Sequence, residues 1–225
     1  MSKNVIVTGT TGNLGSAVAK KFISEGYQVI GSKSNGRISP EDGVHYFEAD
    51  LTDENSTREF FNLVLKQFNK IEAGIFLVGG FGMGNIENTT DTDIRKLFSL
   101  NFMTAYHCAQ NAYKYFKMNG SGKMVLVGAK PALEGGGSEM LAYTISKSAV
   151  IKLAELLNET GKKDNIQTSV IIPSVIDTPL NRSSMPNATF SDWVTPEAIA
   201  EATYFLISKK GDALRDTVLK IYGNS

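Results

Sequence analysis

The stretch Val5-Ile6-Val7-Thr8-Gly9-Thr10-Thr11-Gly12-Asn13-Leu14-Gly15 joins a short apolar run to a segment of helical period that begins at Ser16. The apolar run predicts a buried strand, and glycines in a strand-to-helix turn let the backbone approach a pyrophosphate closely. The helix N-terminus adds unpaired N–H groups and the favourable end of a dipole. Glycines also serve turns and tight packing, but this placement favours dinucleotide binding. The predicted cofactor contacts here are Gly9, Thr11, Gly12, Asn13, Leu14 and Gly15.

Beyond this turn, apolar runs of strand length alternate with longer stretches of helical period. That alternation is typical of a parallel sheet with helices on both faces. We predict one Rossmann-type, doubly wound α/β domain over residues 1–225, with a mainly parallel seven-stranded sheet. The predicted strands are 4–8, 28–32, 45–49, 74–78, 123–128, 167–172 and 218–222. The predicted helices are 14–24, 54–69, 91–118, 142–160 and 196–208, the last with Thr195 as N-cap and Pro196 in the first turn.

The composition excludes several classes of function. The 225 residues include 23 basic and 23 acidic side chains, which argues against a general nucleic-acid binder. The N-terminus enters a strand pattern at once and has no apolar stretch long enough for a signal peptide or a membrane span. One cysteine, Cys108, and two histidines argue against a disulfide or a zinc site. We therefore expect a cytoplasmic protein that uses a small-molecule substrate, with no nucleic-acid, membrane or metal partner.

The end of the second predicted strand, Gly31-Ser32-Lys33-Ser34-Asn35-Gly36-Arg37, lacks the acid that would bind the adenosine 2′-hydroxyl of NAD. Lys33, Arg37 and the hydroxyls of Ser32 and Ser34 can instead pair with a 2′-phosphate. We therefore predict NADP(H) over NAD(H); the alternative is that the two basic side chains only solvate a loop. Asp50, followed by Leu51, ends the third strand, where it could contact the adenine amino group or cap the following helix.

Two segments rich in glycine, proline and short polar residues, 79–90 and 173–195, follow predicted strands. Ligands in open parallel sheets bind beyond the carboxyl ends of strands, so we predict that these segments wall the substrate site. Gly79 and Gly80 begin the first segment and are predicted to lie against the cofactor. The apolar side chains that could form a wall for a flat ring are Phe81, Met83, Met185, Phe190 and Trp193, although packing is the commoner role for each.

Tyr143 and Lys147 stand four residues apart in Leu141-Ala142-Tyr143-Thr144-Ile145-Ser146-Lys147, so a helix would place them on one face. A free phenol has a pKa of roughly 10, and a tyrosine that exchanges protons near neutrality needs a nearby cation to stabilise its phenolate. The pair therefore predicts a proton donor and its tuning lysine. Taken alone, the same spacing also fits an ordinary helix surface.

The glycine-rich turn, Asp50, Asn101 in Leu100-Asn101-Phe102 and the Tyr143/Lys147 pair together resemble a short-chain dehydrogenase/reductase over essentially the whole chain. The resemblance implies that Tyr143 is the general acid or base and that Lys147 lowers its pKa and holds the nicotinamide ribose. It assigns to Asn101 the organisation of a proton-relay water. Family members commonly associate through the helix that carries the tyrosine, so we expect a homodimer or homotetramer.

The resemblance also places Pro173, Ile176 and Thr178 at the carboxamide side of the nicotinamide, while Thr178 could equally cap a helix before Pro179. The family usually has a serine about a dozen residues before the tyrosine, where it hydrogen-bonds the substrate carbonyl; this chain has Ala129. Losing such a donor would be expected to cost an ordinary ketone reductase roughly two orders of magnitude in rate.

A narrower resemblance accounts for the alanine. The run Gly128-Ala129-Lys130-Pro131-Ala132-Leu133 and the later Asp177-Thr178-Pro179-Leu180-Asn181-Arg182 are similar to the dihydropteridine reductase branch, which reduces quinonoid dihydropterins and has alanine in place of the serine. The resemblance implies an NAD(P)H-dependent reductase that transfers hydride to a flat electrophilic substrate. The alternatives are a carbonyl or quinone reductase of the same broad family and a non-catalytic NADP-binding redox sensor.

Overall fold

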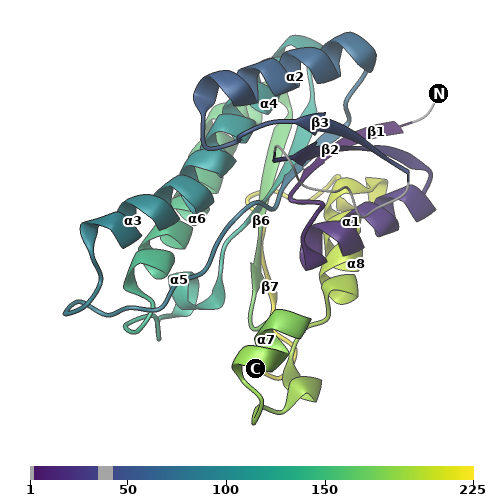
Figure 1. Ribbon diagram of the computed structural model, residues 1–225. Coiled ribbons are helices and arrows are strands. Elements are labelled where there is room, and N and C mark those ends of the chain that lie inside the picture. The colour runs from purple at the N-terminus through teal and green to yellow at the C-terminus, as the bar shows by residue number, and fades with distance from the viewer. Residues whose placement is uncertain (1–2, 35–42) are drawn as a thin grey trace.

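The fold is a seven-stranded parallel sheet in the order β3-β2-β1-β4-β5-β6-β7, shown in Figure 1. The computed structural model describes residues 3–34 and 43–225. The strands are β1 (Lys3–Thr8), β2 (Tyr27–Lys33), β3 (Val44–Glu48), β4 (Ala73–Phe76), β5 (Gly122–Val127), β6 (Ile166–Pro173) and β7 (Val218–Ile221). The predicted fold class and all seven predicted strands are confirmed.

Helices cover both faces of this sheet (Figure 1). Their bounds are α1 (Asn13–Ser24), α2 (Glu54–Gln67), α3 (Asp91–Phe98), α4 (Thr104–Asn119), α5 (Lys130–Glu134), α6 (Leu141–Gly161), α7 (Pro179–Ser184) and α8 (Pro196–Ile207). Thr195 accepts a hydrogen bond from the Ala198 N–H, which confirms it as the predicted N-cap of α8.

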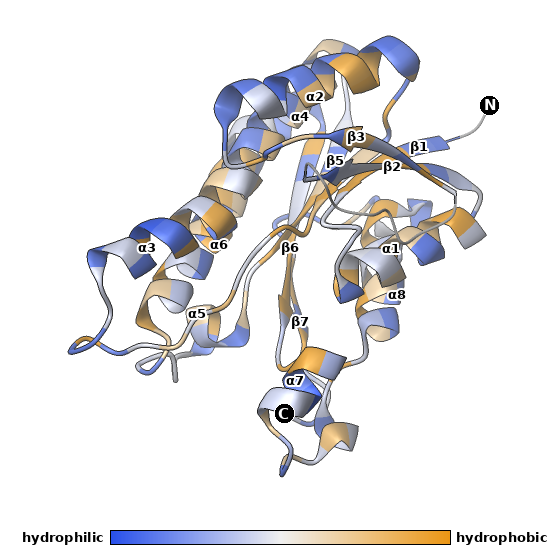
Figure 2. Cartoon of the chain, in the orientation of Figure 1, coloured by the Kyte–Doolittle hydropathy of each residue, from blue (hydrophilic) through white to orange (hydrophobic). Residues whose placement is uncertain are grey.

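The two faces are built by side chains that alternate along each strand. On β1, Val5 and Val7 pack with α1 and α8, whereas Ile6 faces the core formed with α2, α4 and α6. Orange, hydrophobic colouring runs along β6 and β7 in Figure 2. Cys108 is buried in the second of these layers, as expected for a packing residue.

The strand order fixes where a ligand can bind. The chain runs outward from β1 to β3, then returns to place β4 on the other side of β1. The loops after β1 and β4 consequently diverge, and this reversal point is where open α/β sheets bind their ligands. The glycine-rich turn follows β1, and Gly79 and Gly80 follow β4, so the topology brings both predicted cofactor segments to the same edge.

The structure differs from the predicted elements in an interrupted helix, two additional short helices and an earlier strand end. The predicted helix 91–118 is interrupted at Ser99–Met103, where one π-helical segment separates α3 from α4. Two short helices were not predicted: α7 lies in the predicted loop 173–195, and α5 lies in a stretch for which no element is predicted. Each has a proline in its first turn, a position that costs the helix no backbone hydrogen bond. β4 ends at Phe76 rather than at 78, because the Leu77 N–H donates to the Thr8 hydroxyl.

Across the described residues, no helix is long and apolar enough to cross a membrane. The same part of the chain holds no group of three or more histidine, cysteine, aspartate or glutamate side chains that could bind a metal ion.

Candidate active site

The turn after β1 is shaped to approach a phosphate. Gly9 has φ of 75°, and its carbonyl accepts the Gly12 N–H at 3.0 Å. A Cβ on Gly15 would lie 2.0 Å from the Gly9 oxygen, so only glycine fits there. No side chain caps α1 and its first turn has no acid, which leaves the N–H groups at Asn13 and Leu14 for an anion. This cradle fits the diphosphate of a dinucleotide.

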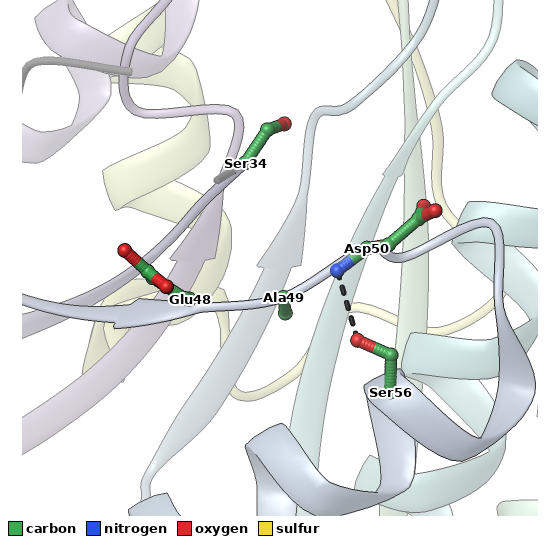
Figure 3. A pocket seen from close by; sticks show the side chains of 5 residues that line it. All are labelled: Ser34, Glu48, Ala49, Asp50 and Ser56. Carbon is green, nitrogen blue, oxygen red and sulfur yellow. Dashed lines mark hydrogen bonds between the residues drawn. The ribbon is translucent and has the colours of Figure 1, made fainter. Parts of the chain in front are cut away.

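A pocket of about 470 Å³ lies between the ends of β2 and β3 and is lined by Ser34, Glu48, Ala49, Asp50 and Ser56 (Figure 3). Lys33, predicted to bind a 2′-phosphate, lies with its Nζ 3.9 Å from a Glu48 carboxylate oxygen. Ser32 is buried, and Arg37 lies outside the described residues. Sequence reasoning missed Glu48, because only the pairing of Lys33 with Glu48 between β2 and β3 brings this acid beside the cofactor end of β2.

Asp50 stabilises its own loop. One carboxylate oxygen accepts from the Thr52 N–H at 2.9 Å and from the Thr52 hydroxyl at 2.6 Å. The N-cap of α2 is Asp53, which accepts from the Ser56 N–H, so the alternative that Asp50 caps this helix is wrong. Figure 3 shows the Asp50 carboxylate at the pocket. The backbone N–H of Asp50 donates to the Ser56 hydroxyl. Contact between Asp50 and adenine stays a prediction, as does the role of the buried Leu51.

Lys147 is buried where the ends of β4 and β5 meet. Its Nζ donates to the Val127 carbonyl at 2.9 Å, and a Cβ on Gly79 would lie 3.3 Å from it. Burial lowers the pKa of Lys147 to about 8 and raises the pKa of Tyr143 to about 12, because a low-dielectric site disfavours the charged form of each. The phenol is therefore held protonated, the state that a proton donor requires.

Asn101 sits in the π-helical segment and is almost fully buried. Its amide oxygen accepts from the Gly80 N–H at 2.8 Å, and its Nδ2 donates to the Gly80 carbonyl at 3.1 Å. Nδ2 also donates to the Ser146 hydroxyl at 2.9 Å. Single π-helical turns are frequent at functional sites. The structure thus brings Asn101, Gly79, Gly80 and Lys147 together.

The position that usually supplies a hydroxyl to the substrate carries none. Ala129 is buried between β5 and α5, and Ser138, nearer to Tyr143 in sequence, is exposed. Of the two hydroxyl groups that the family resemblance leads us to expect at the substrate, this chain therefore has only that of Tyr143.

The segment after β4 supplies apolar surface next to the tyrosine. The rings of Phe81 and Tyr143 lie edge to face with their centroids 5.0 Å apart, and Met83 nearby in sequence is exposed. Gly84 donates to the Glu139 carbonyl and accepts from the Leu141 N–H, both at 2.8 Å. These backbone hydrogen bonds attach the segment to the start of α6.

In the segment after β6, the predicted residues divide into two environments. Met185 is partly exposed, whereas Trp193 is buried and contacts Phe190 with ring centroids 4.9 Å apart. The Arg182 guanidinium lies over the Phe190 ring at 4.9 Å and pairs with Asp177 through two hydrogen bonds.

Pro173, Ile176 and Thr178 run from the end of β6 to the start of α7. Ile176 forms a bridge with Val194, which fixes this stretch against the later part of the loop. The Thr178 hydroxyl accepts from the Asn181 N–H at 3.2 Å, so the capping role is confirmed. An accepting hydroxyl keeps its own proton for donation, and the predicted contact with a carboxamide is compatible with the cap.

Comparison with known proteins agrees with this arrangement. The family model for short chain dehydrogenase matches residues 3–189. A dihydropteridine reductase from Dictyostelium discoideum is 30% identical over 91% of this chain and 87% of that protein. The 3-oxoacyl-[acyl-carrier-protein] reductase MabA of Mycobacterium tuberculosis is 24% identical over 99% of this chain and 92% of its own length.

Among solved structures, ElxO with NADP bound superposes with a TM-score of 0.91 at 24% identity, covering 99% of this chain and 98% of that one. A ligand-free aldohexose dehydrogenase from Thermoplasma acidophilum gives a TM-score of 0.88 at 23% identity, covering 99% and 93%. These similarities show the same fold. With the family match over most of its length, the chain belongs to the short-chain dehydrogenase/reductase family and is an NAD(P)-dependent oxidoreductase of that family.

Proposed function

We propose that this protein reduces a flat, electrophilic substrate of the quinonoid dihydropterin class, using NADPH and Tyr143 as the proton donor. The observation that carries the proposal is Ala129, a buried methyl group at the position where a ketone reductase of this family needs a hydroxyl. An electron-poor quinonoid ring accepts hydride while one acid supplies a proton, so a single donor suffices. The similarity to a dihydropteridine reductase supports this choice.

The chain's own residues divide the work. The turn from Gly9 to Gly15 would hold the diphosphate, and the bound cofactor supplies hydride from its nicotinamide. Tyr143 donates its phenolic proton to the substrate as the hydride arrives. Lys147, as a cation, would stabilise the resulting phenolate and so oppose the burial that raises the pKa of Tyr143 to about 12. Tyr143 then recovers a proton from solvent.

A preference for NADPH rests on the end of β2. Ser32, Lys33 and Ser34 present no carboxylate to a 2′-phosphate. The gap of 3.9 Å between Lys33 and Glu48 is longer than a direct hydrogen bond, so the ammonium can turn to a phosphate at small cost. Glu48 is the group that opposes this preference, because its charge repels a phosphate.

The test compares quinonoid dihydropterin with a panel of ketones and quinones, each with NADPH and with NADH, in the wild type and in Tyr143→Phe. We expect turnover to be fastest with the dihydropterin and NADPH, and Tyr143→Phe to lose about 10²- to 10⁴-fold in rate while still binding NADPH. Tyr113→Phe is the matched control, since Tyr113 bonds to Thr160 and Asp164 at the opposite end of α6.

Other outcomes would point to other functions. Equal or faster turnover of simple ketones would favour a carbonyl reductase. The name of the similar protein MabA, a 3-oxoacyl-[acyl-carrier-protein] reductase, describes an activity of that kind. Tight cofactor binding without turnover of any substrate would favour a redox sensor. A clear preference for NADH would overturn the assignment of Lys33.

A further inference from the structure

Ser146 stands beside Lys147 but faces the interior, where its side chain is 0% exposed. Its hydroxyl donates to the Tyr143 carbonyl at 2.7 Å and accepts from Asn101 Nδ2 at 2.9 Å. The hydroxyl therefore joins two groups that are 42 positions apart in the chain, on α6 and on the π-helical segment. Nothing in the proposed proton transfer uses this serine.

The hydrogen-bonded chain extends from the cofactor loop to the proton donor. Asn101 holds both the N–H and the carbonyl of Gly80, and its remaining amide hydrogen goes to Ser146. The Ser146 hydroxyl in turn donates to the backbone carbonyl of Tyr143. Gly79 lies against Lys147 and Asn101, so one continuous series of contacts sets the first turn of α6 relative to the loop after β4.

A comparison within α6 separates this arrangement from ordinary helix chemistry. Serine hydroxyls in helices commonly bond to a carbonyl three or four residues earlier, and the exposed Ser148 does so with Thr144 at 2.9 Å. Ser148 also lies 3.2 Å from the Ala132 carbonyl of α5, but it accepts no hydrogen bond from any described side chain there. Ser146 makes the same kind of local bond but also accepts from a side chain of another element. The bond to Asn101 is the feature that a purely local role does not require.

We propose that Ser146 is a positioning residue for proton transfer. Its hydroxyl fixes the positions of Tyr143 and Lys147 relative to Gly79 and Gly80, which are predicted to lie against the cofactor. Proton and hydride transfer both depend on placement, and a misplacement of about 1 Å can cost on the order of 100-fold in rate. Replacing the hydroxyl leaves one buried amide hydrogen of Asn101 without its partner, so the first turn of α6 loses its fixed reference. The two hydrogen bonds between Asn101 and Gly80 remain in such a variant, so the loop at Gly79 and Gly80 keeps its position.

The activity part of this inference rests on the proposed function. The experiment measures single-turnover oxidation of saturating NADPH by quinonoid dihydropterin in Ser146→Ala, Ser146→Thr and Ser148→Ala. We expect Ser146→Ala to lose roughly 10- to 100-fold in hydride-transfer rate with an unchanged Kd for NADPH. Ser146→Thr, which keeps the hydroxyl, restores most of the rate, and Ser148→Ala behaves as the wild type.

A wild-type rate in Ser146→Ala, an equal loss in Ser148→Ala, or a rate loss matched by weaker NADPH binding would overturn the positioning role. If the wild type turns over no substrate, the proposed function fails but the linkage is still testable by hydrogen exchange in the unliganded protein. Faster exchange in Ser146→Ala at both 143–147 and 79–80 supports the linkage. A change confined to one of the two segments, or in neither, contradicts it.

Discussion

The ring of Phe81 meets the ring of Tyr143 at an interplanar angle of 69°, with the centroids 5.0 Å apart. Phe81 is nevertheless 61% exposed, so one edge is packed on Tyr143 while most of the ring faces solvent. The hydrogen bonds between Gly84 and the start of α6 hold the segment in place. An exposed aromatic ring fixed beside the proposed general acid is suited to cover a flat substrate.

We expect Phe81→Ala to raise the KM for a flat substrate by roughly three- to tenfold, because an aromatic contact contributes about 0.5–1.5 kcal/mol beyond its burial. The Kd for NADPH should not change. Steady-state kinetics with quinonoid dihydropterin measure the effect, and Phe205→Ala, which removes an exposed ring on α8, is the control. An unaltered KM in Phe81→Ala would remove this residue from the substrate site.

The buried Lys147 predicts a pH-dependent stability. Its pKa falls from 10.5 to about 8 on folding, so the unfolded chain binds the proton more tightly between these values. Stability therefore rises as the pH increases from about 8 to 10.5, by roughly 3 kcal/mol in total, and the same amount is lost as the pH returns from 10.5 to 8.

Urea unfolding of the unliganded wild type and Lys147→Met across this range isolates the contribution of Lys147, since other titrating groups cancel in the difference. The wild type should gain stability relative to Lys147→Met as the pH rises. Lys152→Met, at an exposed lysine of the same helix, is the control for the loss of a lysine charge. A difference between the wild type and Lys147→Met that does not change with pH would contradict the lowered pKa.

The acid beside Lys33 should weaken NADP(H) binding. Replacing it in Glu48→Gln removes a carboxylate from the pocket and frees the Lys33 ammonium. We expect the Kd for NADPH to fall about two- to fivefold, the range of a surface ion pair, with little change for NADH. Glu59→Gln, an equal change of charge on the exposed face of α2, is the control. A gain for both cofactors alike would mean that Glu48 does not read the 2′-position.

Two glycines of the turn after β1 should respond differently to alanine. A Cβ on Gly12 would lie 3.5 Å from the Gly9 oxygen, an ordinary contact, whereas on Gly15 it would lie at 2.0 Å. Gly15→Ala should therefore destabilise the fold by about 1–3 kcal/mol and abolish cofactor binding. Gly12→Ala should keep the wild-type Tm but bind NADPH more weakly. Thermal unfolding and cofactor titration measure both, and wild-type affinity in Gly12→Ala would contradict the phosphate cradle.

The strands were predictable because fully buried parallel strands are apolar along their length, as in Val5-Ile6-Val7. The helix from 91 to 118 was predicted as continuous because a π-helical segment keeps an apolar face and carries no proline or glycine signal. The segment is defined by its backbone bonds, such as that from the Thr104 N–H to the Ser99 carbonyl five residues earlier, and the Asn101 side chain within it bonds to Gly80 only in the folded chain. The short helices α5 and α7 were not predicted, because five or six residues are too few to show a helical period of apolar side chains.

The sequence by itself determined the fold class, the glycine-rich turn and the Tyr143/Lys147 pair, because each depends on residues close together in the chain. Only the tertiary structure decided which side chains contact one another at the site. It placed Glu48 beside Lys33, joined Ser146 to Asn101 and set Phe81 against Tyr143. These contacts depend on strand register and on the meeting of separate elements at one sheet edge, and local sequence does not encode such distances.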